Sequence, residues 1–326
     1  MKSNTLDRLI GMGCVAVGAL AGAASIGPGV GTVNAAPTTA RQFPPAGTAP
    51  AGPPATLTGD GYRLVWHDEF DKDGPLNPAD WGYENGFVRN QEAQFYQPEN
   101  AVCKGGFLII EARKESKPNP KYVAPATSVA GRGGTGWPNL PTIDITSASV
   151  NTRGKHEWTY GRFEIRAKIV VRSGSWPAVW TLGTSGGWPG NGEVDVMEYY
   201  RNTVLANVAW QGPSGAAWNT GKTPLSTLPA DWATKFHTWR MDWDEKAIRL
   251  FRDEVKVNEQ ELSQTVNAGG RGAGVNPFIN KPIYILLNQA IGGQSGGDYS
   301  GTEFPVFFHV DYVRVWQKAP VTQAGG

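Results

Sequence analysis

The sequence predicts an all-β fold, a sandwich or jelly roll of two antiparallel sheets. Glycine and aromatic residues are abundant, with 42 glycines and 13 tryptophans among 326 residues. The apolar segments are short and alternate with polar residues, and Gly, Pro, Asn and Asp separate them. Helical periodicity is weak throughout, and we find no internal repeat with a period of about 20 to 50 residues that would indicate a propeller.

Short strands can be assigned along the chain from these patterns. The clearest ones span residues 107–112, 163–169, 239–243, 248–251, 282–290 and 310–316. The third and fourth, joined through Asp244-Glu245-Lys246, predict a hairpin. We expect one helical turn near residues 230–235 and a loop over the glycine-rich residues 292–297. In such folds a curved sheet can offer a concave face to an extended polymer.

The N-terminus has the features of an export signal. Lys2 and Arg8 supply positive charge, an apolar segment of small residues follows, and Val33-Asn34-Ala35 fits a cleavage site. We therefore expect a protein secreted to the extracellular space or periplasm, without a membrane span. The expected divisions are a signal peptide over residues 1–35, a Pro/Ala/Gly-rich linker over 36–58, one catalytic domain over 59–319, and a tail over 320–326.

Composition excludes several other classes of protein. The net charge of +1 gives no reason to expect nucleic acid or an anionic membrane as partner. Only Cys103 remains once the signal is removed, so we expect no intrachain disulfide. The histidines show no ligand spacing, and no serine elbow or phosphate loop is present. We expect a monomer that needs no cofactor for catalysis.

The most informative segment is Glu193-Val194-Asp195-Val196-Met197-Glu198, an apolar run that carries three carboxylates. In a regular strand Glu198 would face away from Glu193 and Asp195. A β-bulge at Met197 would bring all three acids to one face, with Val194 and Val196 toward a core. The two glutamate α-carbons would then lie roughly 13 Å apart. Their side chains could bring the carboxyls within the ~5–5.5 Å typical of a retaining glycosidase pair.

Two other interpretations of the acids remain open. The strand face could be solvated, although its apolar neighbours favour a buried setting. Alternatively, the carboxylates could hold a hard cation such as Ca²⁺ or Mg²⁺.

Three tryptophans, Trp176, Trp180 and Trp188, precede the acids. Indole faces stack on apolar faces of sugar rings, and the ring N–H can bond a hydroxyl. Trp176 and Trp180 are four residues apart and share a face in an extended strand. For each indole, a place in the core is as compatible with the sequence as a place in a cleft.

The acidic segment resembles the Glu-x-Asp-x-x-Glu signature of family 16 glycoside hydrolases. Further blocks carry the same resemblance through most of the mature chain: residues 66–70, 90–96, 160–164, 176–180 and 310–315. Their order is similar to that of laminarinase-type endo-β-1,3-glucanases.

The resemblance implies a β-jelly-roll with a concave catalytic cleft, an endo-acting mechanism and hydrolysis with retention. Glu193 would be the nucleophile and Glu198 the general acid/base, with Asp195 between them. Glu198 must begin protonated, so its pKa should be raised by burial and nearby negative charge. A catalytically silent carbohydrate-binding protein and a metal-dependent hydrolase are the rival interpretations.

The resemblance also suggests residues that bind substrate or metal. Trp176, Trp180 and Trp188 match cleft tryptophans, whereas Asn90 and Arg113 match residues on the non-reducing side. Asp311 matches the side-chain ligand of a structural calcium ion that some members hold on the convex face.

This chain departs from the laminarinase pattern after the acids. Residues 203–210 lack the histidines of that pattern, and Gln289 replaces an apolar residue. We therefore expect Asn207, Trp210 and Gln289 to reshape the cleft. A β-galactan of agar, carrageenan or host-glycan type remains an alternative to β-1,3-glucan.

Overall fold

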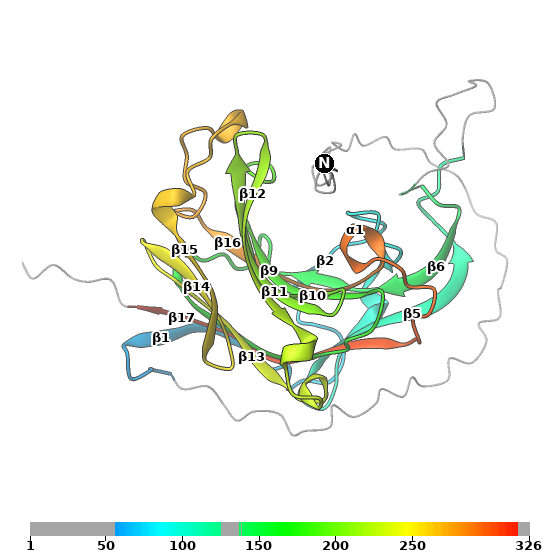
Figure 1. The fold of residues 1–326 in the computed structure, drawn as a ribbon. Helices are drawn as coiled ribbons and strands as arrows, with labels where there is room; N and C mark the ends of the chain where they lie inside the picture. Colours follow the sequence, from blue (N-terminus) through cyan, green and yellow to red (C-terminus); the bar gives the residue numbers. More distant parts are fainter. Residues whose placement is uncertain (1–55, 125–136, 138, 319–326) are drawn as a thin grey trace, which may run out of the picture. The chain divides into compact units, whose positions relative to one another are not determined.

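The computed structural model describes residues 56–124, 137 and 139–318, which form two β-sheets (Figure 1). The ten-stranded sheet has the order β15-β14-β13-β8-β17-β5-β6-β3, with β1 beside β17 and β4 beside β5. The seven-stranded sheet has the order β12-β11-β10-β9-β16-β7-β2. Every pair of strands is antiparallel except β3 with β6. The predicted all-β, two-sheet class is confirmed.

The strands are β1 (Tyr62–Asp68), β2 (Gly82–Tyr83), β3 (Phe95–Tyr96), β4 (Ala101–Cys103), β5 (Leu108–Pro118), β6 (Thr142–Ser147), β7 (Ser149–Asn151), β8 (Gly161–Ile169), β9 (Ser175–Gly183), β10 (Glu193–Tyr200), β11 (Thr203–Gly212), β12 (Gly215–Pro224), β13 (His237–Trp243), β14 (Ala247–Arg252), β15 (Val255–Glu261), β16 (Ile283–Ile291) and β17 (Val306–Lys318). The helical segments are η1 (Pro98–Asn100), η2 (Leu225–Thr227), η3 (Trp232–Thr234), η4 (Leu262–Gln264), η5 (Gly270–Gly272) and α1 (Gly293–Gly296).

The six strands assigned from sequence are all present, as β5, β8, β13, β14, β16 and β17. The hairpin of β13 and β14 and the helical turn at η3 are also confirmed. The expected loop at residues 292–297 is wrong in one respect, because it contains the short helix α1. Gly292 and Gly297, with φ of 67° and 74°, flank this helix in a conformation that few other residues adopt.

The main core is shared by both sheets. Phe163 and Ile165 of β8 contribute from the ten-stranded sheet, and Val194 of β10 and Val208 of β11 contribute from the seven-stranded sheet. All four are at most 1% exposed. In β8 the alternation of fully and partly buried residues follows the period of two that the sequence shows. Burial of this core fixes which face of each strand turns away from it.

The bulge in β10 lies where the sequence predicts it. Asp195 pairs with Asn207 of β11, but the next pair joins Glu198 to Leu205, so three steps on β10 oppose two on β11. Met197 is fully buried in the main core. The extra residue restores Glu198 to the face that carries Glu193 and Asp195.

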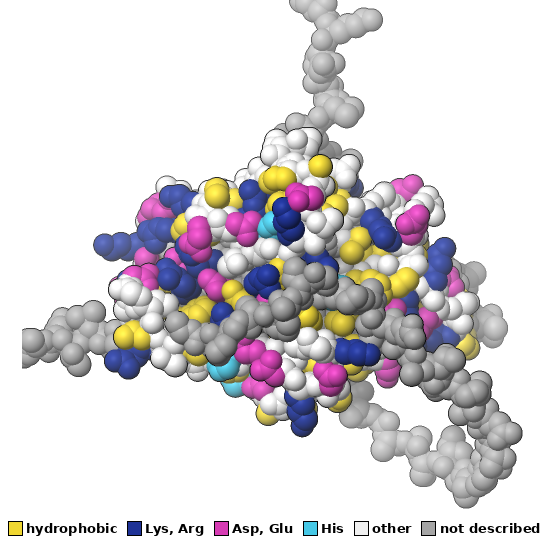
Figure 2. All heavy atoms as spheres, turned by 90° about the horizontal axis from the view of Figure 1, so that it is seen from below, with side chains coloured by type: hydrophobic (Ala, Val, Ile, Leu, Met, Phe, Trp, Pro, Cys, Tyr) yellow, Lys and Arg dark blue, Asp and Glu magenta, His cyan; other side chains and the backbone are white. Residues whose placement is uncertain are grey.

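The predicted signal peptide and the 320–326 tail lie outside the described residues, as does nearly all of the linker. Within the described part, the chain has no helix long and apolar enough to cross a membrane. Cys103 is buried and unpaired with another cysteine. On the face shown in Figure 2, basic and acidic side chains are interspersed, in keeping with the net charge of +1.

Candidate active site

The three acids of β10 lie on the face turned away from the main core. Asp195 is 3% exposed, whereas Glu193 and Glu198 are half-buried. The carboxyl of Asp195 lies within reach of a hydrogen bond to both Glu193 and Glu198. A hydrogen bond between two carboxyl groups needs a proton on one of them. Crowded carboxyls in this arrangement favour a protonated trio over three separate negative charges.

Neutral donors hold each of the two glutamates. The indole Nε1 of Trp188 donates to Glu193 Oε2 at 2.8 Å, and that of Trp176 donates to Glu198 Oε1 at 2.8 Å. Asn207 Nδ2 donates to Asp195 Oδ2 at 2.9 Å and to Glu198 Oε2 at 2.8 Å. These bonds fix the direction of every carboxyl in the trio.

Burial and mutual repulsion raise the pKa of all three acids. Burial and the charge of Glu198 raise the pKa of Glu193 to about 8. Burial and the charge of Asp195 raise the pKa of Glu198 well above its ordinary value, and burial and Glu193 do the same for the pKa of Asp195. The Trp188 N–H and the positive charge of Arg89 favour ionised Glu193. These two contacts favour negative charge on Glu193, while burial beside Asp195 favours the protonated form of Glu198.

Trp176 and Trp180 of β9 share the face of the acids, as their spacing predicts. Each is 8% exposed, and neither belongs to the main core. Trp180 Nε1 donates to Asn288 Oδ1 at 2.8 Å, and its ring packs with Tyr284 and Leu286. Trp176 contacts an acid directly, whereas Trp180 forms part of the sheet surface beside the acids.

The three indole N–H groups therefore have three different partners, which gives a prediction for the pH profile. Replacing Trp188 with phenylalanine removes a donor to ionised Glu193 and raises its pKa. The acid limb of kcat/KM should then move upward by about one pH unit. Trp176→Phe should instead raise the pKa of Glu198 and move the alkaline limb upward. Trp180→Phe is the matched control and should move neither limb; a shift of the acid limb in that variant would contradict the assignment.

Crowding of acids also predicts that Asp195→Asn stabilises the fold while reducing activity. Since the folded-state pKa of Asp195 is raised, the unfolded chain ionises first as pH rises. Asp195 therefore lowers the free energy of unfolding progressively from about pH 4 upward. The variant should gain about 1–3 kcal/mol at pH 8 and little at pH 4. Thermal unfolding at both pH values measures this, and an equal gain at both would contradict it.

Asn207 and Trp210 of β11 face opposite sides of the sheet. Asn207 is 3% exposed and contacts two of the acids, as described above. Trp210 packs against the main core instead. The expectation that Trp210 lines the cleft is therefore corrected, because residues three apart on a strand point in opposite directions.

Gln289 of β16 also lies away from the cleft. It is fully buried, and its Nε2 donates to Ser175 Oγ at 3.1 Å and to the carbonyl of Ala290 at 2.9 Å. Its neighbour Asn288 is the residue on the cleft side, where it contacts Trp180. Gln289 therefore does not reshape the cleft by direct contact.

Asn90 lies at a sharp bend, where it and Gln91 have φ values of 56° and 54°. Its Nδ2 lies 3.4 Å from Glu92 Oε1, and its carbonyl accepts from Gln294 N at 2.9 Å. The bend thus connects Asn90 to helix α1, which follows strand β16. No hydrogen bond joins Asn90 to Glu193, Asp195 or Glu198.

Arg113 of β5 is placed by an ion-pair network of its own. It pairs with Glu111 at 2.9 Å and Glu115 at 2.6 Å, and it donates to Asn100 Oδ1 at 3.1 Å. None of the ion pairs and hydrogen bonds of Arg113 is with Glu193, Asp195 or Glu198.

Arg89 was not singled out from the sequence, because one arginine in a loop carries no pattern. Its guanidinium lies 5.0 Å from the ring centroid of Trp180 and pairs with Glu84. Its Nη1 is buried and has no hydrogen-bond partner among the described residues. Arg89 therefore places a positive charge beside the indole surface and favours the ionised form of Glu193.

The side chains around Asp311 do not form a calcium site. Asp311 is 2% exposed and pairs with Arg166. Calcium takes about six to eight oxygen ligands. Within residues 56–124, 137 and 139–318, no group of three or more His, Cys, Asp or Glu side chains is arranged to hold a metal ion. A calcium ion there would depend on main-chain carbonyls, and its presence stays a prediction.

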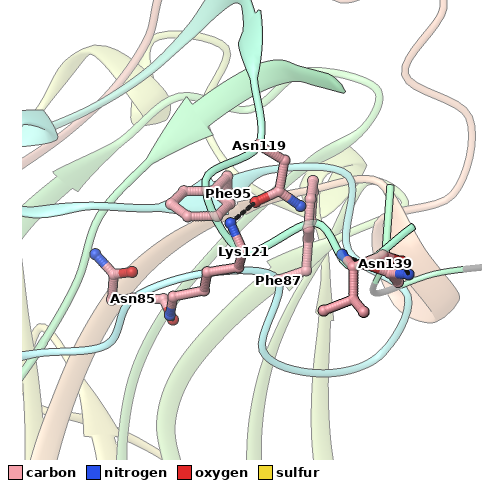
Figure 3. A pocket seen from close by; sticks show the side chains of 8 residues that line it. Asn85, Phe87, Phe95, Asn119, Lys121 and Asn139 are labelled. Carbon is pink, nitrogen blue, oxygen red and sulfur yellow. Dashed lines mark hydrogen bonds between the residues drawn. The ribbon is translucent and has the colours of Figure 1, made fainter. Parts of the chain in front are cut away.

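A separate pocket of about 350 Å³ opens near Asn85, Phe87 and Lys121 (Figure 3). The three acids are not among its lining residues. The ammonium of Lys121 already bonds the carbonyl of Asn85 at 2.6 Å and lies over the ring of Phe95. We assign no chemistry to this pocket.

Comparisons with known proteins agree with the geometry. The family model for glycosyl hydrolases family 16 matches residues 123–295. A β-glucanase of Rhodothermus marinus is 34% identical in an alignment of 274 residues that covers 78% of this chain and 85% of that protein. A laminarinase catalytic domain of Thermotoga maritima is 30% identical, with a TM-score of 0.65 over 79% of this chain and 99% of that domain. A solved structure described among endo-acting O-glycanases of human gut bacteria is 34% identical, with a TM-score of 0.68 over 82% of this chain and 94% of that one.

Proposed function

The chain belongs to family 16 of the glycosyl hydrolases, and on that premise we propose that it cleaves internal bonds of a β-1,3-glucan with retention of configuration. The observation that carries the proposal is the bulged strand β10, which places Glu193 and Glu198 on one face with Asp195 between them. A pair of carboxyls with different preferences for the proton is what a retaining mechanism requires.

In the proposed first step, ionised Glu193 attacks the anomeric carbon while Glu198 transfers its proton to the departing oxygen. The product of this step is a covalent glycosyl-enzyme. Water then attacks the same carbon, Glu198 takes a proton from it, and Glu193 is released. Asn207 and Trp176 hold Glu198 in place for both transfers.

Asp195 has a positioning role in this proposal. A proton on its carboxyl, in addition to the one on Glu198, leaves the trio with a single negative charge. The Trp188 N–H directs this charge to Glu193.

Names of relatives support β-1,3-glucan as the substrate, since a β-glucanase and a laminarinase each match most of the chain. The N-terminal sequence supports secretion to the extracellular space or periplasm. We propose that the mature enzyme acts as a monomer without a cofactor.

A reducing-end assay on a panel of polysaccharides tests the substrate. The panel holds laminarin, mixed-linkage glucan, agarose, carrageenan and a mucin-type galactan, with Glu193→Ala as the control for each. We expect release from laminarin. Release from a galactan alone would overturn the substrate while leaving the chemistry intact. Binding without release from any polymer would favour a catalytically silent carbohydrate-binding protein.

A further inference from the structure

Two tryptophans among the described residues are unusual because they are exposed. Trp188 is 40% exposed and Trp218 is 42% exposed, while the other tryptophans among the described residues are buried or half-buried. The two rings lie beside one another, with centroids 6.4 Å apart and planes at 50°. Large apolar groups exposed together commonly mark a binding surface.

Strand register places Trp218 on the face of the acids. Glu193 of β10 pairs with Ala209 of β11, and Ala209 pairs with Trp218 of β12. Paired residues on neighbouring antiparallel strands point to the same face. Trp218 thus faces the cleft two strands from Glu193, roughly 10 Å away across the sheet.

The other face of β12 is already occupied. Asn219 Nδ2 donates to the carbonyl of Glu259 on β15 at 2.8 Å, and Asn258 Nδ2 donates to the carbonyl of Asn219 at 3.1 Å. Exposure alternates along β12, with Trp218, Thr220 and Lys222 exposed and their neighbours half-buried. Trp218 therefore needs no partner from the core, and packing of the fold does not explain a tryptophan here.

The ring of Trp188 links Glu193 and Trp218. Ala209, the residue between these two on the sheet, has only a methyl side chain and is fully buried, so the exposed surface here is made by the two indoles. Trp188 is held in place by its bond to Glu193, and its ring contacts Trp218. Because the two planes are inclined at 50°, neither ring covers the face of the other. The exposed indole surface therefore begins at the residue that holds Glu193 and extends to Trp218 on strand β12.

We propose that Trp218 and Trp188 form a sugar-binding subsite at the β12 edge of the cleft, which stacks against a ring of the polymer away from the cleaved bond. The proposal rests on the function proposed above and extends it to the length of chain that the enzyme recognises. An indole face suits the apolar face of a pyranose, and stacking there adds affinity without taking part in bond cleavage.

Binding of β-1,3-gluco-oligosaccharides of increasing length tests the subsite. Calorimetry would use the Glu198→Gln background, which slows turnover by about 10²–10⁴-fold and leaves the Trp188–Glu193 contact intact. Trp218→Ala should weaken binding of long oligosaccharides about tenfold, equivalent to ~1.4 kcal/mol, and leave the shortest ones unaffected. Trp218→Phe should retain most of the affinity. Val65→Ala, an exposed apolar residue of β1, is the control and should change nothing.

Unchanged affinity at every length in Trp218→Ala would overturn the subsite. An equal loss at every length, accompanied by a lower Tm, would also overturn it, because that pattern indicates a structural role. If the polysaccharide panel shows no action on β-glucan, the proposed function fails separately. The binding series is then repeated with oligosaccharides of increasing length made from whichever polymer the wild type cleaves or binds. The two outcomes described above test the subsite in that series as well.

Discussion

Glu193→Ala is expected to abolish turnover while leaving the polymer bound. The variant loses the oxygen that attacks the anomeric carbon, so we expect kcat to fall on the order of 10⁴-fold or more. Stacking surfaces such as Trp218 do not depend on that carboxylate, so affinity for the polymer should stay within a few-fold of wild type. Initial rates on laminarin and affinity electrophoresis in the same polymer measure the two effects.

Azide provides the positive control for this variant. The alanine leaves space next to the anomeric carbon, and azide can attack there when the substrate carries an activated leaving group. The product should be an α-glycosyl azide, formed by a single inversion. Normal turnover in Glu193→Ala, or a β-azide product, would contradict the assignment of Glu193 as nucleophile.

Glu198→Gln should slow a substrate in proportion to how strongly its leaving group depends on protonation. A sugar leaving group needs protonation, so kcat/KM on laminarin should fall by about 10²–10⁴-fold. An activated aryl leaving group needs little protonation, so the rate at which its glycosyl-enzyme forms should be nearly unaffected. Breakdown of that intermediate lacks the base, so a burst of phenol followed by a slow steady state is expected.

Glu164→Gln is the matched control for this substitution. Glu164 is a half-buried glutamate of strand β8, in the ten-stranded sheet that does not carry the acids. It accepts a hydrogen bond from the hydroxyl of Tyr312 at 2.8 Å. The Glu164→Gln variant should keep the wild-type ratio of kcat/KM on laminarin to kcat/KM on the aryl glycoside. Equal losses on laminarin and on the aryl glycoside in Glu198→Gln would argue against Glu198 as the acid.

The sequence predicted the strands and the bulge because both follow from burial. The alternation of apolar and polar residues in β8 indicates a strand with one buried face. In β10, the three acids can share one face opposite Val194 and Val196 only if the strand contains an extra residue. Those features are local, so a short window of sequence contains them.

Contacts between distant strands could not be predicted in this way. Residues 215–224, which form β12, are small and polar and lack a strand pattern, so Trp218 was not assigned to the cleft. Trp210 and Gln289 were placed by their position in the sequence, whereas their roles depend on which face of the sheet they occupy. The register with neighbouring strands decides that face, and the sequence of one strand does not contain it.

The stereochemistry of the first product tests the central claim most directly. Proton NMR of laminarin during the first minutes of hydrolysis follows the anomeric signals of new reducing ends. The account predicts that the β-anomer appears first and that the α-anomer follows by slow mutarotation, since two inversions at one carbon retain configuration. An α-anomer that appears first would show a single displacement by water and would contradict a covalent role for Glu193.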